Sequence, residues 1–407
     1  MTIDAHTASG TLSPIGVVLD INSVAATLDE GWSPYCQVTV VAAAPDEETR
    51  ALIDLRETRI YLDLRLRQDF GQPWTLADIT ADITGSVAAF TALLAGRPLS
   101  KLTNRYYRPW NGSSVRAAST RSMHLLVTER VFDEKTNEMT LTATSLESLL
   151  LGDALVSTSP LDPATLSVRA IVQSVLNRYG EVLAEESLDA MVSVAEATVW
   201  PPGVGAWAYL DPMLEAASLR LWCDELGTFT ITERQPTTPG AIAITPTGTM
   251  TGLRDTMTFD PDVWFDAVVV EYRWVDDFDL NNVAYDVAGP QPARAVLREL
   301  RPLTRYPGPG AAAGILNRGQ GRGRVLAVDA VSSYGATPGI AATITPLEAE
   351  AQTGYVSAVT WRIPQGEMSV ATRGLVDTPD TSWLFVEPGT SWLDIPIGTS
   401  WLEYEGV

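Results

Sequence analysis

Residues 59–67 read Arg59-Ile60-Tyr61-Leu62-Asp63-Leu64-Arg65-Leu66-Arg67, and this stretch decides the fold class. Apolar residues alternate with polar or amphipathic ones, and a period of two is that of a β-strand with one buried face. The segments 123–127 and 139–143 repeat the alternation on either side of the polar turn 133–137, which predicts a β-hairpin. The first 150 residues therefore read as a β-domain.

Residues 144–147, Thr-Ser-Leu-Glu, fit a capping box at the start of a helix. In that motif Glu147 would occupy the third helical position and its side chain would turn back to the N-cap. We therefore expect a short helix to close the β-domain.

Residues 160–255 change to helical spacing. The apolar positions of 168–179 follow a period near 3.6, with Ser167 as the N-cap and Gly180 as the stop. A second helix is expected over 207–217, either broken or started at Asp211-Pro212, and a hairpin over 219–232 follows it. This stretch predicts a small α+β unit.

Residues 260–375 return to short strands, at 268–275, 322–331, 340–345, 355–363 and 367–372, with a short helix at 311–316. Such a series indicates a small barrel or sandwich. The predicted fold class is mainly β with an α+β insert: two small β-barrel-like domains plus a helix–hairpin domain. The predicted boundaries are an N-terminal β-barrel-like domain at 1–152, the α+β domain at 153–258, the second β-barrel-like domain at 259–376 and a tail at 377–407.

The composition excludes several classes of protein. The chain of 407 residues has 28 Lys and Arg against 50 Asp and Glu, a net charge of −22, which disfavours stable binding to nucleic acid. Two cysteines exclude a disulfide scaffold, and two histidines, His6 and His124, argue against a His-based metal site or triad. We expect no metal and no cofactor, and we expect His124 to be structural. We expect no membrane span and no signal peptide, and we therefore expect the chain to fold in a cytosol.

Two clusters remain ambiguous at this level. Asp276, Asp277 and Asp279 could hold calcium, but a solvated hairpin tip explains them better because the loop lacks the glycine and terminal glutamate of a calcium-binding hand. The stretch 97–121 is basic and rich in aromatic residues. It could contact nucleic acid, although an ion-paired contact with an acidic neighbouring subunit fits this acidic chain better.

The C-terminal tail holds a repeat. The word Thr-Ser-Trp-Leu occurs at 381–384, 390–393 and 399–402, at a strict interval of nine residues, with proline and glycine between the copies. Tryptophan is favoured at the centre of protein interfaces. The candidate partner-binding residues are Trp383, Leu384, Trp392, Leu393, Trp401 and Leu402. The alternative is that the repeats fold back on this chain's own barrel as a flap.

The order of segments resembles the baseplate-hub or tail-hub proteins of tailed bacteriophages, which are called minor tail proteins in phages of high-GC bacteria. The resemblance rests on residues 140–150, 166–172, 219–227, 354–360 and 368–375, and it covers about residues 15–375. It implies a contractile-phage-hub-like fold, with two related barrels in a homotrimeric ring of pseudo-sixfold symmetry. It also implies a structural role at the virion tail tip, after synthesis and assembly in the host cytoplasm.

The implied partners are a distal tail protein, the tape-measure protein and other tip or fibre proteins. DNA would pass through the channel without specific binding, and no stable membrane insertion is expected. The chain shows no appended lysozyme- or peptidase-like domain, so we expect it not to be an enzyme. Two alternatives stay open: a distal tail or glycan-binding protein using exposed Trp32, Trp74, Trp110 and Trp200, and a cell-wall hydrolase using two carboxylates.

Overall fold

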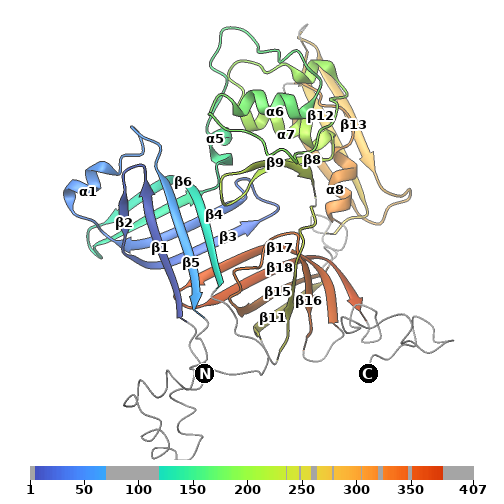
Figure 1. Ribbon diagram of the computed structural model, residues 1–407. Helices are drawn as coiled ribbons and strands as arrows, with labels where there is room; N and C mark the ends of the chain where they lie inside the picture. Colours follow the sequence, from blue (N-terminus) through green and yellow to red (C-terminus); the bar gives the residue numbers. More distant parts are fainter. Residues whose placement is uncertain are drawn as a thin grey trace, which may run out of the picture.

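The computed structural model describes residues 5–69, 119–234, 236–246, 249–257, 264–276, 279–303, 305–319, 324–346 and 351–378. Figure 1 shows two groups of β-strands side by side and, above them in this view, a helical region with a separate small sheet. The predicted fold class, mainly β with an α+β insert, is confirmed.

The N-terminal strands form the first group. They are β1 (Ala5–Ser13), β2 (Val17–Leu19), β3 (Ile21–Asp29), β4 (Cys36–Ala43), β5 (Tyr61–Asp69), β6 (Ser119–Asp133) and β7 (Glu138–Thr144), with helix α1 (Glu47–Leu52) between β4 and β5. Their order is β3-β4-β7-β6-β5-β1-β2. The predicted alternation is confirmed, because Ile60, Leu62, Leu64 and Leu66 are all buried.

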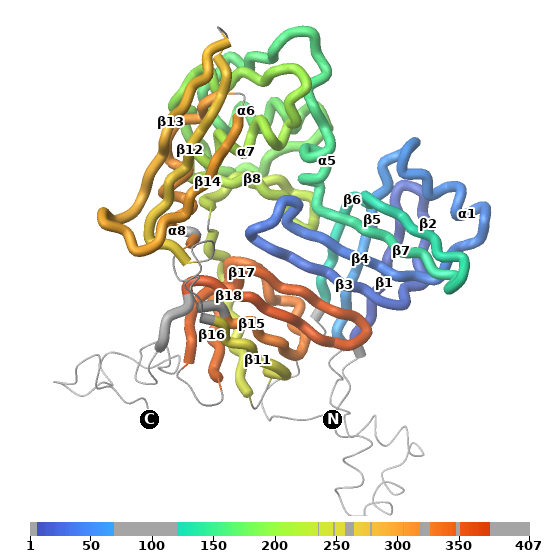
Figure 2. The backbone as a smooth tube through the Cα atoms, turned by 180° about the vertical axis from the view of Figure 1, so that it is seen from behind, coloured from blue at the N-terminus to red at the C-terminus, as the bar shows by residue number. Residues whose placement is uncertain are grey.

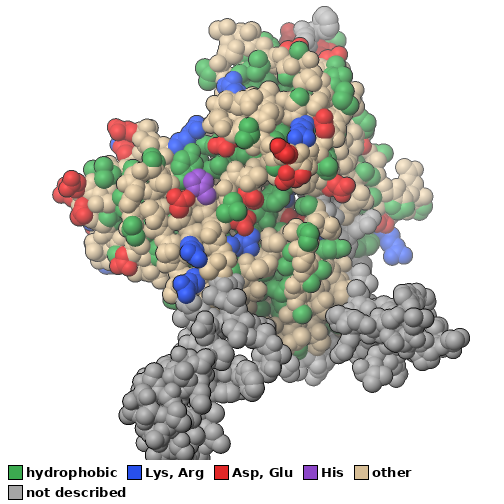
Figure 3. Space-filling view, viewed as in Figure 1, with side chains coloured by type: hydrophobic (Ala, Val, Ile, Leu, Met, Phe, Trp, Pro, Cys, Tyr) green, Lys and Arg blue, Asp and Glu red, His purple; other side chains and the backbone are tan. Residues whose placement is uncertain are grey.

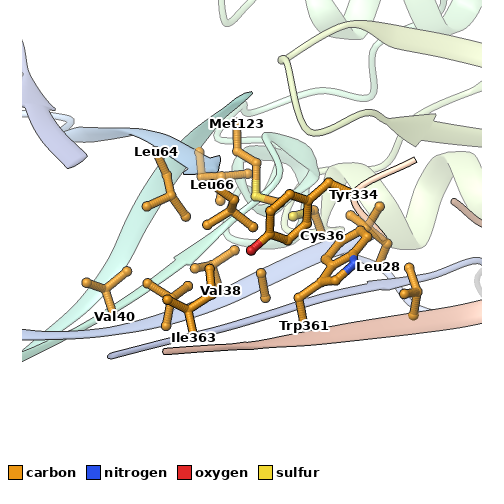
Figure 4. Packing of buried hydrophobic residues seen from close by; sticks show 14 of the residues in the cluster. Leu28, Cys36, Val38, Val40, Leu64, Leu66, Met123, Tyr334, Trp361 and Ile363 are labelled. Carbon is orange, nitrogen blue, oxygen red and sulfur yellow. The ribbon is translucent and has the colours of Figure 1, made fainter. Parts of the chain in front are cut away.

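The C-terminal strands form the second group. They are β10 (Ala241–Ile244), β11 (Met250–Met257), β15 (Arg324–Val331), β16 (Ala341–Ile344), β17 (Ala351–Ile363) and β18 (Glu367–Thr378). β17 pairs with β3 from Ala358–Asp29 to Ile363–Val24, so both groups belong to one continuous sheet. They also share a hydrophobic core, in which side chains of β3 to β6 pack around Trp361 and Ile363 of β17 (Figure 4).

The helix–hairpin unit lies between the two groups in sequence. It contains α5 (Glu147–Leu151), α6 (Val168–Leu176), the 3₁₀ turn η1 (Ala195–Thr198), α7 (Ala206–Ala216) and the hairpin β8 (Leu219–Cys223) to β9 (Phe229–Glu233). The predicted cap of α6 is confirmed, since Ser167 Oγ accepts a hydrogen bond from the Ala170 N–H at 3.1 Å. Pro212, however, lies inside α7. Burial of Leu210, Met213 and Leu214 holds the helix together across the missing N–H.

The predicted capping box at 144–147 is wrong. Helix α5 begins at Glu147 itself, its N-cap is Leu146, and no side chain caps it. Glu147 is instead fully buried and turned toward β4 and β8. The buried N–H groups of Tyr35 and Cys223 need an acceptor, and Glu147 binds them instead of capping the helix.

The three-stranded unit comprises β12 (Ala267–Val275), β13 (Asn281–Ala288), β14 (Val296–Pro302) and α8 (Ala311–Gly319). Its strand order is β13-β12-β14, and α8 packs on the face formed by Val268, Val270 and Tyr272. The strand 268–275, which the sequence pattern assigns to the second barrel, belongs to this separate sheet. The domain boundaries themselves remain predictions.

The view from behind shows the N-terminal strands meeting the C-terminal strands at β3 and β17, while the other two units lie together on one side of both (Figure 2). None of the helices in the described ranges could span a bilayer. The longest of them, α7, has 11 residues, about half of what a transmembrane helix needs.

Candidate functional site

The two histidines are engaged in packing. His124 Nδ1 lies 2.6 Å from Asp63 Oδ1, and its ring stacks on Tyr61 with centroids 4.9 Å apart. His6 Nδ1 lies 3.2 Å from the hydroxyl of Tyr334. Both cysteines are buried, and among the described residues no three His, Cys, Asp or Glu side chains are grouped as metal ligands would be.

Asp276 and Asp279 of the acidic cluster lie between strands β12 and β13. Asp276 Oδ1 accepts from the Leu280 N–H at 3.0 Å, and Oδ2 accepts from the Asn282 side-chain amide at 2.9 Å. Asp277 lies outside the described residues. The carboxylate of Asp276 is therefore occupied in holding the turn between β12 and β13.

A network of buried charges joins the units at the loop between β3 and β4, and we call it the junction (Glu30, Glu147, Arg220 and Arg373). The Arg220 guanidinium of β8 donates to the backbone carbonyls of Glu30 and Trp32, the latter at 2.7 Å. Arg373 Nε of β18 lies 2.5 Å from Glu30 Oε1, and both side chains are almost fully buried. One loop is thus held by the helix–hairpin unit and by the C-terminal strands.

Glu147 is the buried carboxylate of the junction. It accepts from the Tyr35 N–H at the start of β4 and from the Cys223 N–H at the end of β8, the latter at 2.9 Å. Burial raises the pKa of Glu147 from 4.5 to about 7, while the charge of Arg220 and these hydrogen bonds oppose the rise. This carboxylate therefore connects the N-terminal strands to the helix–hairpin unit.

We expect Glu147 to make the protein less stable as the pH rises. Its pKa is higher in the folded chain than in the unfolded chain, so the folded state binds more protons between pH 4.5 and about 7. Its stabilising contribution is complete below pH 4.5 and is lost as the pH rises through 7. Urea unfolding at several pH values measures this. The variant Glu147→Gln cannot titrate at this position, so its stability should depend less on pH over that window; an unchanged pH dependence would contradict the assignment.

A second ion pair joins three elements. Arg121 of β6 pairs with Glu225 in the turn between β8 and β9, and it donates to the carbonyls of Tyr334 and Ala336 at 3.0 and 2.9 Å. The interpretation of the basic stretch 97–121 as a contact with a neighbouring subunit is wrong for Arg121. Arg121 is largely buried and binds groups of its own chain, and residues 97–118 of that stretch lie outside the described residues.

The tryptophans and repeat residues named from the sequence differ in burial, and several lie outside the described residues. Trp200, proposed as an exposed glycan contact, is fully buried, and its indole N–H donates to the Val204 carbonyl at 2.9 Å. Trp32 is 44% exposed, and Trp74 and Trp110 lie outside the described residues. The candidate partner-binding residues also lie outside them: Trp383, Leu384, Trp392, Leu393, Trp401 and Leu402.

A small apolar pocket of about 130 Å³ lies between α7 and the end of β14. Tyr209, Pro212 and Met213 line it on one side and Pro302 and Leu303 on the other. Ligand pockets for small molecules have volumes of about 300 to 1,000 Å³, so this one is smaller than a typical ligand site. Acidic side chains are spread over several parts of the face of the molecule seen in Figure 3.

Comparison with known proteins finds similarity in structure only. No family model and no curated protein matches the chain. A tail protein from Neisseria meningitidis MC58 superimposes with a TM-score of 0.52 at 10% identity, over 91% of this chain and 96% of that one. The 43 kDa tail protein of prophage MuSo2 from Shewanella oneidensis gives 0.48 at 9% identity, over 91% and 98%. The prophage tail protein gp18 from Listeria monocytogenes gives 0.45 at 6% identity, over 90% and 94%.

The first of these matches shows that the chain shares the fold of a tail protein over nearly its whole length. The resemblance to tail proteins drawn from the sequence is therefore confirmed at the level of the fold.

Proposed function

We propose that the chain is a structural hub protein of a bacteriophage tail, forming a ring at the tail tip that joins the tail tube to the tip or fibre proteins and surrounds the DNA channel. The observation that carries the proposal is the shared fold with a tail protein over 91% of this chain and 96% of that one. The role is structural and involves no catalysis, which fits the packing of His124 and the use of the buried carboxylates in joining units.

The hub is a homotrimer. The pairing of β17 with β3 supports this, because it brings two groups of strands edge to edge within one chain. Three copies would supply six such groups, and equivalent edge contacts between copies would close a ring with pseudo-sixfold symmetry. With a net charge of −22, the channel wall is acidic and repels the DNA that passes through it.

The partners of the hub are a distal tail protein, the tape-measure protein and other tail-tip or fibre proteins. It resides at the tail tip of the virion after synthesis and assembly in the host cytoplasm, with no stable insertion into a membrane. We propose that the repeat residues 381–402 contact copies of the chain or these neighbours.

Mass in solution and imaging of particles test the hub. A ring of three copies with an acidic inner wall is the expected result. A ring of six copies would indicate a distal tail protein, a monomer with affinity for glycan would indicate a receptor-binding protein, and an arginine-lined pore would contradict the acidic channel. Clearing of peptidoglycan by the purified protein, abolished by changing one pair of carboxylates, would contradict the structural role.

Deletion of the residues after Asp380 should leave a folded, soluble trimer that fails to assemble into infectious tails. The strand-edge contacts lie before this point, whereas the Thr-Ser-Trp-Leu words lie after it. Complementation of a phage that lacks the gene, followed by counting infectious particles, measures the defect. Aggregation or unfolding of the truncated protein would instead show that the repeats pack on their own barrel.

A further inference from the structure

The sheet of the three-stranded unit buries one face and leaves the other exposed. Its inner face packs on α8, while its outer face carries apolar side chains that the described part of the chain leaves between 45% and 60% exposed. These are Val283, Tyr285 and Val287 on β13 and Val296 and Leu300 on β14. A sheet face with this many exposed aliphatic and aromatic side chains is typical of a protein contact surface.

The strand register places these side chains on one face. Across β12, Glu271 pairs with Tyr285 on one side and Leu300 on the other, so the three form one row. Paired residues point to the same side of a sheet, and alternate residues of each strand follow them. Apolar side chains of β13 and β14 thus lie on both sides of Glu271 and Arg273 in β12, and Val269 and Val275 of β12 share the same face.

The centre of this outer face carries an excess of positive charge. The buried Glu271 carboxylate is shared by Arg273, at 2.6 Å, and Arg298, at 3.4 Å. The Arg273 and Arg298 side chains are 58% and 74% exposed, so each keeps N–H donors accessible to solvent. Two cations against one anion leave a local charge of +1 on a chain whose net charge is −22. A partner for this face should therefore be apolar with acidic residues between its apolar anchors.

Residues 379–407 have that composition. They contain three Trp-Leu pairs and five acidic residues but neither lysine nor arginine. An acidic residue follows each tryptophan within four positions, and these are Glu387, Asp394 and Glu403. Glu387 and Asp394 therefore lie between successive Trp-Leu pairs, as Arg298 lies between Val296 and Leu300 on the face.

The lengths also agree. One repeat of nine residues extends about 30 Å, and β12, also of nine residues, is about as long. Two successive Trp-Leu pairs can therefore contact the two ends of one face, with the acidic residue between them near Arg273 and Arg298.

We propose that the outer face of β13-β12-β14 binds the C-terminal repeat segment of a neighbouring copy, an inference that rests on the proposed trimer. In a closed ring each copy meets the next through two different, complementary surfaces, and the segment and the face would add such a contact to the strand-edge contacts that close the ring. The chain leaves β18 at the end of the sheet where β15 begins, and β15 follows α8, which covers the opposite face of the three-stranded unit.

Disulfide trapping in the full chain tests this. The native Cys36 and Cys223 are fully buried and do not interfere. One copy carries Tyr285→Cys and another carries Leu393→Cys, and the two are mixed, refolded or co-expressed, and oxidised. The expected result is a disulfide-linked pair of copies on a non-reducing gel. The matched control replaces Tyr285→Cys by Val18→Cys on β2, which is 77% exposed and lies outside the outer face, and it should give no linked pair.

Reversal of charge tests the recognition. Arg298→Glu should lower the yield of the linked pair by about fivefold, because like charges then face each other. Arg56→Glu, on an 88% exposed arginine outside the outer face, should leave the yield unchanged. A yield of linked pair no higher than that of the Val18→Cys control overturns the proposal. A chain that carries both Tyr285→Cys and Leu393→Cys gives a second check: a disulfide that forms only within that chain also overturns it. Light scattering on the same samples separates failure of the docking from failure of the hub. Trimers without the disulfide refute the docking alone, whereas monomers refute the trimeric hub.

Discussion

Replacement of Glu215 by alanine is expected to lower the free energy of unfolding by about 3 to 5 kcal/mol. Glu215 of α7 is almost fully buried and binds two arginines: Arg234 at the end of β9, at 3.0 Å, and Arg301 of β14, whose Nη2 lies 3.2 Å from Oε1. Without the carboxylate, two largely buried arginine side chains lose their shared counter-charge, and each retains a more exposed partner, Asp211 or Glu299. The contact between the helix–hairpin unit and the three-stranded unit should therefore weaken.

Urea unfolding followed by circular dichroism measures this effect, and Asp211→Ala provides the matched control. Asp211 also lies on α7 and faces the same Arg234, but at 3.8 Å and half exposed to solvent. An exposed pair of this kind contributes at most about 1 kcal/mol. Equal losses in the two variants would show that Glu215 does not hold the units together.

The individual strands and helices could be predicted because their signals are local. The buried positions of β5 and the N-cap Ser167 of α6 follow from residues within a few positions of each other. The pairing of β17 with β3 could not be predicted in this way. It joins Val24 to Ile363, and nothing in either strand specifies a partner more than 300 residues away.

The junction shows why a local motif can fail. Thr144 and Glu147 have the spacing of a capping box, yet the buried N–H groups of Tyr35 and Cys223 require an acceptor, and Glu147 supplies it. The sequence did hold one signal for this network. Arg220 interrupts the apolar strand Leu219-Arg220-Leu221, and an arginine in such a position usually has a specific partner.

The candidate site on the repeats stays a prediction, since residues 381–402 lie outside the described part of the chain. The surface to which we assign them was missed from the sequence. The alternation at 268–275 indicated one amphipathic face, but only the register of β13 and β14 against β12 shows that apolar side chains gather on both sides of Arg273.

Replacement of Trp361 by alanine is expected to lower the free energy of unfolding by about 3 to 5 kcal/mol, because it leaves a cavity where the two groups of strands meet. Trp361 is fully buried in β17 and pairs with Ala26 of β3. Its indole N–H donates to the Ser333 carbonyl at 3.0 Å, and the Arg121 guanidinium lies 4.9 Å from the ring centroid. The substitution thus removes packing, a hydrogen bond and a cation–π contact at one position.

Two further variants separate these contributions in urea titrations. Trp361→Phe keeps an aromatic ring but loses the donor to Ser333, so its loss should be smaller than that of Trp361→Ala. Val331→Ala, at a partly exposed position of β15, should cost less than either. If Trp361→Ala cost no more than Val331→Ala, the pairing of β17 with β3 would not depend on this side chain. A large loss would instead show that the joint between the strand groups is held by its buried side chains, because the backbone pairing alone is the same in all three variants.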